Sequence, residues 1–437
     1  MIRILKNLLL LMGGFFAGRK SAPGRPPPVR RPGWGRFFKR LAAVVPALVL
    51  GGFLVAASGL VPIAASSGHW GITAWFLQFS KARSVATHTL GMSAPPLDDR
   101  ALIVKGAGHY EIGCRSCHGG LEVQPRIPSA ATPRPPYLPP RISRWEPEEL
   151  FYIVKHGIKF TGMPAWPSLE REDEVWAVVA FLRVLPDLDQ ASYRRLVEGD
   201  LQSTEQPAQQ GAVPETDTAG VGIEELAIVD RQATVPEIVS RTCAPCHGRA
   251  GEGREVSAFP RLAGQRPDYL HASLRVYASG ERHSGIMEPV AAELTDEEMR
   301  EMALYFARSQ ASPRLRDDIP PDTSSLLGLV PAGPFTESDS ASLAMLEVGR
   351  EIAYRGVPER KVPSCADCHG PVDRPRNPLY PNLAGQYADY LALQLGLFKD
   401  RRRGGSDFAE IMHHTVSELT AYEMEAVAQF YEYLGAR

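Results

Sequence analysis

The residues of this chain with the clearest chemical potential are its six cysteines, which all lie in three short segments of the same spacing. The segments read CRSCH at 114–118, CAPCH at 243–247 and CADCH at 365–369. Two cysteines three positions apart, with a histidine directly after the second, suit a redox disulfide, half of a zinc site or a haem attachment point. A redox pair does not need the histidine, and no cysteine remains to build a disulfide framework.

The spacing distinguishes between the remaining two chemistries. On a helical turn, residues i and i+3 are neighbours and residue i+4 lies on the same face. Two thiols so placed can form thioethers to the two vinyl groups along one haem edge, and the histidine then points its ring at the iron. Four-coordinate zinc would need further ligands from remote histidines, three times over. We therefore predict three covalently attached haem c groups (iron), held by Cys114, Cys117, His118, Cys243, Cys246, His247, Cys365, Cys368 and His369.

The sixth ligand of each iron decides between an electron carrier and an enzyme with an open iron. One methionine stands at a similar distance after each motif. We expect each to lie on a loop just before a terminal helix, where its sulfur can bind the iron and raise the haem potential relative to two histidines. These methionines are Met163 (45 residues after His118), Met287 (40 after His247) and Met412 (43 after His369).

Two details of the predicted sites stay open. Nearby histidines are rival sixth ligands: His156 for the first haem, His283 for the second, and His413 or His414 for the third. A metal-bound histidine usually donates its other ring N–H to a carbonyl or carboxylate. Pro260 and Pro381, at matched positions before LAGQ, are candidates to supply that carbonyl. The first block offers Pro135, Pro136, Pro139 and Pro140.

The charge of the chain is unevenly distributed. Residues 1–97 contain twelve Lys or Arg and no acidic residue, whereas residues 98–437 hold 36 basic and 50 acidic side chains, a formal net charge of −14. Between the basic head and the acidic body, residues 41–65 are uncharged, which is enough to cross roughly 30 Å of hydrocarbon as a helix. The preceding basic residues place the N-terminus in the cytoplasm and the rest outside. A cleavable signal peptide is the competing interpretation.

The segment 69–91 mixes Trp70, Trp75, Phe76 and Phe79 with basic residues. It is expected to be a helix at the membrane surface, or a helix packed on the first globular block. Polar and proline-rich stretches further on indicate linkers. The expected organisation is a basic cytoplasmic segment (1–40), a transmembrane helix (41–65), an interfacial helix and connector (66–97), a first block (98–197), a linker (198–222), a second block (223–311), a linker (312–335) and a third block (336–437).

The second and third blocks are an internal repeat. PRLAGQRPDYL (260–270) aligns with PNLAGQYADYL (381–391), and MEPVAAELTDEEM (287–299) aligns with MHHTVSELTAYEM (412–424). Thr295 with Glu298, and Thr420 with Glu423, are capping boxes that predict the start of a final helix. Apolar residues then recur at helical intervals and predict one buried stripe in each block. No block shows alternating strand patterns, so the fold class is all-α, with three small domains in tandem after the N-terminal helix.

Each block resembles a small single-haem (class I) cytochrome c domain, with CxxCH on a helix, a loop methionine and a terminal helix. The second and third blocks resemble the dihaem cytochromes c of bacterial respiratory chains through CAPCHGRAGEG, PRLAGQRPDYL and the methionine to Leu-Thr interval. The first resembles monohaem domains that carry GMPAW. The third block departs from the pattern with GPVDRPRNP and a basic insert, KDRRRGGSD (399–407). The resemblance covers about residues 98–437 and implies assembly outside the cytoplasm.

We expect a membrane-anchored electron carrier in a respiratory chain, with its haem domains on the periplasmic side of the bacterial inner membrane. Irons with two protein ligands cannot bind substrate, so the chain is expected not to be an enzyme by itself. The expected partners are an upstream dehydrogenase or quinol-oxidising complex, a downstream terminal oxidase or reductase, and membrane lipid; no nucleic acid is expected. The alternatives are a cytochrome c subunit of a membrane-bound dehydrogenase or terminal oxidase or reductase complex, and a haem enzyme such as a peroxidase.

Overall fold

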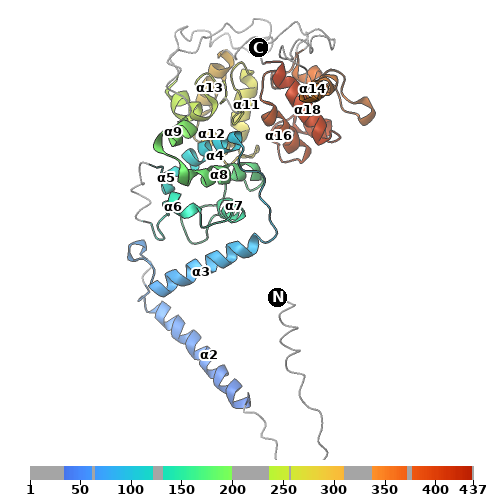
Figure 1. Ribbon diagram of the computed structural model, residues 1–437. Helices are drawn as coiled ribbons and strands as arrows, with labels where there is room; N and C mark the ends of the chain where they lie inside the picture. The colour runs from blue at the N-terminus through green and yellow to red at the C-terminus, as the bar shows by residue number, and fades with distance from the viewer. Residues whose placement is uncertain are drawn as a thin grey trace, which may run out of the picture. The chain divides into compact units, whose positions relative to one another are not determined.

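The computed structural model describes residues 34–61, 64–121, 131–198, 236–254, 257–309, 337–371 and 376–435. Within these ranges the chain is helical, with no strand longer than an isolated bridge, which confirms the all-α prediction (Figure 1). The chain divides into two compact units, Met1–Ser67 and Gly68–Arg437. The predicted linker 312–335, the predicted linker 198–222 after Glu198, and most of the basic segment 1–40 lie outside the described residues.

The first helix, α2 (Trp34–Ala57), has Pro46 in its interior. Its segment Phe37–Ala57 is long and apolar enough to cross a membrane, with 21 residues, a mean hydropathy of 2.0 and none of it buried. The helix does not coincide with the expected transmembrane span 41–65, which stays a prediction. The helix begins earlier because nothing in 34–40 interrupts it, and it ends at Ala57 because Gly59 turns the chain with a φ of 72°, a common way to end a helix.

Helix α3 (Gly71–His88) packs in part on the first block, as one of the two interpretations of segment 69–91 expected, and its place at a membrane surface stays a prediction. Its C-terminal half packs on the first block, where Val85 is buried and the His88 ring stacks on Tyr152 with centroids 5.2 Å apart. Its N-terminal half leaves aromatic rings in the open, since Trp75 is 61% exposed and stacks only on Phe79 of the same helix at 5.7 Å. The exposed half is the part that suits a membrane surface.

Two pairs of helices pack in the same way in the first and third blocks. Helix α4 (Arg100–Gly113) contacts α8 (Glu172–Val184), and α14 (Glu337–Arg355) contacts α18 (Ala421–Tyr433). At each contact a glycine faces a backbone carbonyl: a Cβ on Gly106 would lie 1.8 Å from the Ala177 oxygen, and one on Gly349 would lie 2.1 Å from the Ala426 oxygen. Glycine is needed here because a side chain would separate the helices.

The Gly106 contact makes a direct prediction. Gly106→Ala is expected to lower the free energy of unfolding by about 1–3 kcal/mol, because the added methyl group forces two packed helices apart. Urea denaturation followed by circular dichroism measures the change. Gly113→Ala, at the end of the same helix, is the control because a Cβ there meets nothing within 4 Å. Equal stability of the Gly106→Ala variant and the control would contradict this packing.

Both predicted capping boxes are present. Thr295 begins α13 (Asp296–Arg308) and Thr420 begins α18, each with reciprocal hydrogen bonds to the glutamate three residues later. The predicted stripes are buried, as Met302 and Tyr431 are 2% and 1% exposed. The remaining longer helices are α7 (Pro147–His156), α9 (Gln190–Glu198), α11 (Pro267–Ala278), α16 (Ala388–Lys399) and α17 (Ala409–Val416).

Buried apolar residues gather in three main clusters, each of which lies almost entirely within one block. The cluster of the first block surrounds Tyr110 and Phe181, that of the second surrounds Met302 and Phe306, and that of the third surrounds Phe430 and Tyr431. A fourth, small cluster joins Val104 of the first block to Cys246, Ala258 and Phe259 of the second. The motifs therefore lie on small helical cores that also contact each other.

Candidate functional site

Each CxxCH motif forms a short helical turn that ends at a glycine. The turns are α5 (Arg115–His118), α10 (Ala244–His247) and α15 (Ala366–His369). The amide of His118 donates to the Cys114 carbonyl at 2.9 Å, and His369 does the same to Cys365 at 2.9 Å. A π-helical turn, Val239–Cys243, leads into the second motif. The spacing therefore has the helical geometry that the sequence predicted.

The glycines that end the three turns have φ values of 78°, 82° and 80° at Gly119, Gly248 and Gly370. This left-handed conformation favours glycine. It turns the chain away directly after the histidine.

A proline carbonyl accepts a hydrogen bond from Nδ1 of each motif histidine. His247 donates to Pro260 at 3.0 Å and His369 donates to Pro381 at 2.9 Å, which confirms the two predicted carbonyls. In the first block, His118 donates to Pro136 at 2.9 Å, which selects one of four prolines that the sequence left open. Because Nδ1 carries the proton, Nε2 keeps its lone pair for a metal.

Burial keeps these groups uncharged. It lowers the pKa of all three motif histidines, that of His369 to about 4, although the hydrogen bond to proline opposes the shift. Burial also raises the pKa of the Cys114 and Cys365 thiols to about 12 each. A neutral imidazole and an apolar surrounding are what a haem iron and its porphyrin require.

The three methionines do not all lie on loops. Met163 lies in an irregular segment, as expected. Met287 is the first residue of α12 (Met287–Ala292), and Met412 lies inside α17, where it packs against the core of the third block. The loop prediction is therefore wrong for these two. The physical reason for Met412 is that Ala409, Met412 and Val416 recur at helical intervals on the face packed against the core, with no Gly or Pro to interrupt the helix.

The rival histidines differ in how free their rings are. His413 is buried with both ring nitrogens occupied, Nε2 at 2.8 Å from the Arg403 carbonyl and Nδ1 at 3.3 Å from Glu410. The exposed His283 has Nδ1 3.6 Å from Glu288. His156 packs against the Tyr152 ring with centroids 4.7 Å apart. Met287 and Met412 line the cavity described next, whereas the residues found to line it do not include His156, His283 or His413.

The second and third motifs open into one cavity of about 810 Å³. Its walls include the cysteines and histidines of both motifs together with both methionines: Cys243, Cys246, His247, Met287, Cys365, Cys368, His369 and Met412. The sequence predicted these two sites separately. The structure brings them together, and the size lies within the range of cofactor pockets.

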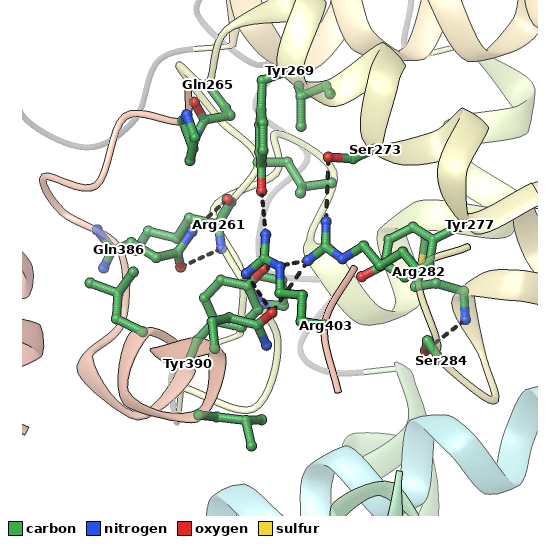
Figure 2. Close-up of a pocket in the computed structure, with 18 of the residues that line it drawn as sticks. Arg261, Gln265, Tyr269, Ser273, Tyr277, Arg282, Ser284, Gln386, Tyr390 and Arg403 are labelled. Carbon is green, nitrogen blue, oxygen red and sulfur yellow. Dashed lines mark hydrogen bonds between the residues drawn. The ribbon is translucent and has the colours of Figure 1, made fainter. Parts of the chain in front are cut away.

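Two arginines inside this cavity have uncharged partners (Figure 2). The guanidinium of Arg282, 6% exposed, donates to the Tyr390 hydroxyl at 3.3 Å and the Gln394 amide oxygen at 3.4 Å. Arg403 donates to the same Gln394 oxygen at 2.6 Å and to the Tyr269 hydroxyl at 3.2 Å. In the described part of the chain, these two guanidiniums donate to hydroxyl groups and to one amide oxygen.

Arg282 and Arg403, which lie close together, create a positive potential in the cavity. Burial raises the pKa of the Tyr269 phenol, but the charges of Arg403 and Arg282 outweigh it and leave the pKa below its ordinary value. Buried charges are normally paired with opposite charges. The cavity thus combines a mainly apolar lining with two thiol pairs, two imidazoles and the guanidiniums of Arg282 and Arg403, which fits groups with an apolar ring and carboxylate edges, as haem has.

The two copies of the internal repeat, in the second and third blocks, also form matching hydrogen bonds to each other at this cavity. The side chain of Gln265 bonds both ways to the backbone of Asn382, at 2.9 and 2.8 Å, and Gln386 bonds both ways to Arg261, at 3.0 and 2.9 Å. Asn382 and Arg261 directly follow the two prolines that hold the motif histidines. Each of the two blocks therefore supports the histidine loop of the other, in the reciprocal manner of a two-fold interface.

The first block contacts the second motif through α4. A Cβ on Gly108 would lie 2.7 Å from the Phe259 ring and 3.3 Å from Cys246 Sγ. Helix α4 continues to Cys114, its C-cap and the first cysteine of the first motif. One helix therefore connects the neighbourhoods of the first two motifs.

Sequence reasoning missed several of these residues. Arg403 lies in the basic insert 399–407, whose charge is visible in the sequence but whose contacts with Gln394 and Tyr269 are not. Arg282 lies five residues before Met287 and gave no local signal. Glu174, a buried carboxylate of α8, reads in sequence as an ordinary first-turn acidic residue.

Comparison with known proteins identifies the kind of site. The sequence model of "Cytochrome C oxidase, cbb3-type, subunit III" matches residues 88–182 and 230–306. The thiosulfate dehydrogenase electron acceptor of Stutzerimonas stutzeri (strain A1501) is 34% identical over 195 residues, covering 45% of this chain and 80% of that protein. Cytochrome c4 of Thiocapsa roseopersicina is 31% identical over 196 residues, covering 44% and 87%. The crystal structure of reduced recombinant cytochrome c4 from Pseudomonas stutzeri is 25% identical, covers 44% of this chain and 93% of its own, and has a TM-score of 0.35.

The chain belongs to the cytochrome c family. Its cofactor is covalently bound haem c, and its function is electron transfer. It acts as a carrier and not as a catalyst, because the family is not itself catalytic.

Proposed function

We propose that this chain binds three haem c groups and conducts electrons between them as a membrane-anchored periplasmic carrier. The observation that carries the proposal is that all three motifs have the same arrangement, with the imidazole Nδ1 at 2.9–3.0 Å from a proline carbonyl. A histidine held this way at only one or two motifs would support fewer haems. The division of residues 98–437 into three haem domains is part of the proposal, and the three main apolar clusters support it.

The proposed ligands follow from this arrangement. Each motif would supply two thioether sulfurs and one imidazole, and the sixth ligands would be Met163, Met287 and Met412. When bound, the haem iron supplies a one-electron redox couple whose potential depends on its axial ligands. The chain's own residues fix the imidazole tautomer, exclude water by burial, and place Arg282 and Arg403 where haem carboxylates need positive charge.

The proposed path runs through all three blocks. The second and third motifs share one cavity, which supports direct transfer between their haems. The first block reaches the second through Gly108 of α4, which lies against Cys246 and Phe259. With the haems arranged in this way, an electron would enter at the first or the third block and leave at the other, without a diffusing intermediate.

Anchoring and location are further parts of the proposal. Phe37–Ala57 has the length and hydropathy of a membrane span, and the basic residues before it favour a cytoplasmic N-terminus. Cytochrome c domains are typically periplasmic, which agrees with this topology. The exposed aromatic rings in the N-terminal half of α3 would then lie near the membrane surface.

The upstream partner that the comparisons support is a dehydrogenase. A relative at 34% identity is a thiosulfate dehydrogenase electron acceptor. We expect thiosulfate dehydrogenase with thiosulfate to reduce the purified protein, as followed by haem absorbance in a stopped-flow experiment. The Stutzerimonas stutzeri relative serves as the positive control. If the relative is reduced and this protein stays oxidised under the same conditions, thiosulfate dehydrogenase is not its electron donor.

One observation favours a second candidate, a permanent subunit of an oxidase complex. The sequence model of a cbb3-type oxidase subunit matches the first two blocks. Extraction from native membranes with a mild detergent separates the two candidates. A free carrier runs at the size of one chain in its micelle, whereas a subunit stays with larger proteins of the complex.

A further inference from the structure

Glu174 is a buried carboxylate of the first block whose contacts extend into the second. It lies in the first turn of α8 and is 3% exposed. One oxygen, Oε2, accepts from the Trp166 indole at 3.1 Å and from the amide of Gly285 at 2.7 Å. The other, Oε1, accepts from the Ser284 hydroxyl at 2.7 Å and lies 3.1 Å from the Arg171 guanidinium.

The Ser284 hydroxyl links Glu174 to the backbone of Met287 by hydrogen bonds. While it donates to Glu174, its oxygen accepts from the backbone amide of Met287 at 3.1 Å and from that of Ile286 at 3.4 Å. The amide of Ser284 itself donates to Glu288 at 2.7 Å. The backbone of segment 284–287, which ends at the first residue of α12, is therefore held at successive positions, and one hydrogen-bonded chain runs from Glu174 through Ser284 to Met287.

The packing around this chain leaves little room for another arrangement. A Cβ on Gly285 would lie 2.1 Å from Trp166 Nε1, so the loop lies directly against the indole. Arg171, 7% exposed, also donates to the His283 carbonyl at 2.8 Å. Residues of the first block thus contact the backbone of 283–285 at successive residues.

We propose that Glu174 is a positioning residue for the second haem: through Ser284, the first block holds the loop that places the Met287 sulfur on the iron. This inference rests on the proposed ligand role of Met287. It makes the sixth ligand of one haem depend on a side chain of the neighbouring block. The first block then acts as part of the second haem site as well as an electron carrier.

The negative charge and the shape of Glu174 both matter to this role. A carboxylate offers only acceptors and can receive all four donors around it. In Glu174→Gln, one oxygen becomes an NH₂ group, which meets donors at either position and leaves at least one of them buried and unpaired. Hydrogen bonds to charged groups are also stronger than neutral ones. The loop is therefore expected to loosen while the fold stays.

The test uses the full-length haem-loaded protein with Glu174→Gln and, separately, Ser284→Ala. The control is Glu172→Gln, the same change two residues away on α8, where Glu172 is 49% exposed and pairs with Lys155 of its own block. Met287→Ala identifies the signals of the second haem. The readouts are the sulfur-to-iron charge-transfer band, the redox titration and the rate of cyanide binding.

Both positioning variants are expected to reproduce the Met287→Ala changes in milder form. Cyanide should bind the second haem about tenfold faster, the factor expected for the loss of one hydrogen bond to a charged group, and its potential should fall. The first and third haems, and the Glu172→Gln protein, should match the parent. If Glu174→Gln does not fold, Ser284→Ala alone decides the outcome.

Two results overturn different statements. If Met287→Ala changes the parent spectrum but Ser284→Ala and Glu174→Gln do not, the positioning role is wrong and the ligand assignment stands. If Met287→Ala leaves the spectrum unchanged, the proposed ligand is wrong, and the positioning role falls with it. A uniform change at all three haems would also contradict the proposal, because it would indicate a general loss of structure.

Discussion

A protein in which Cys243 and Cys246 are both replaced by alanine is expected to lose one covalently attached haem while keeping the other two. The reason is that no other cysteine exists outside the two remaining motifs, so the second block has no thiol left to form a thioether to haem. The mass of the denatured, unproteolysed chain measures the result directly, because only covalent haem survives denaturation. Corresponding pairs at 114/117 and 365/368 should each remove one haem as well.

Two controls make the cysteine result specific. Ser116→Ala changes a residue between two motif cysteines and should leave the haem count at the parent value. Cys246→Ala alone keeps one sulfur and should retain the haem through a single thioether, with a shifted absorption spectrum. Loss of all haem from any one pair variant would contradict independent attachment in the three blocks.

Replacing a proposed methionine ligand is expected to lower one haem potential strongly and to open one iron. Without the Met287 sulfur, the second haem loses the ligand that favours the reduced state, and its potential should fall by about 0.1 V or more within the roughly 0.8 V range that axial ligands span. Carbon monoxide should then bind to the reduced form of that haem. Met163→Ala and Met412→Ala should do the same for the first and third haems.

The matched control is Met299→Leu, a methionine of the same block that is 5% exposed and lies in the core stripe of α13. It should leave all three potentials unchanged. The ligand assignment fails for any methionine whose alanine variant keeps the parent potential and excludes carbon monoxide. His156, His283 and His414 are then the histidines to test, since both ring nitrogens of His413 already have partners.

Local signals in the sequence were enough to find the motifs, the capping boxes and the two proline carbonyls. Each depends on residues close together in the chain: i, i+3 and i+4 for the motif, and three residues for the capping box of Thr295. Pro260 and Pro381 were found because the repeat aligned them. The first block has no such partner in the alignment, so Pro136 could not be separated from its neighbours without the structure.

The features that sequence reasoning missed depend on contacts between distant segments. Arg282 and Arg403 are 121 positions apart, yet both bond to Gln394, and nothing local marks them as neighbours. The hydrogen bond between Glu174 and Ser284 was missed for the same reason, because the two residues lie in different blocks. The helical setting of Met412 was misjudged because a ligand was expected on a loop, whereas its surrounding residues form a regular helix that also packs on the core.

The central claim is that three haems are held in this chain, each between an imidazole and a thioether sulfur. A spectroelectrochemical titration of the purified full-length protein, combined with the haem-to-protein ratio, tests it most directly. The account predicts three covalent haems per chain, a sulfur-to-iron band that titrates with all of them, and no binding of carbon monoxide by the reduced protein. Fewer than three haems per chain, bound zinc, or ready binding of carbon monoxide at every iron would contradict it.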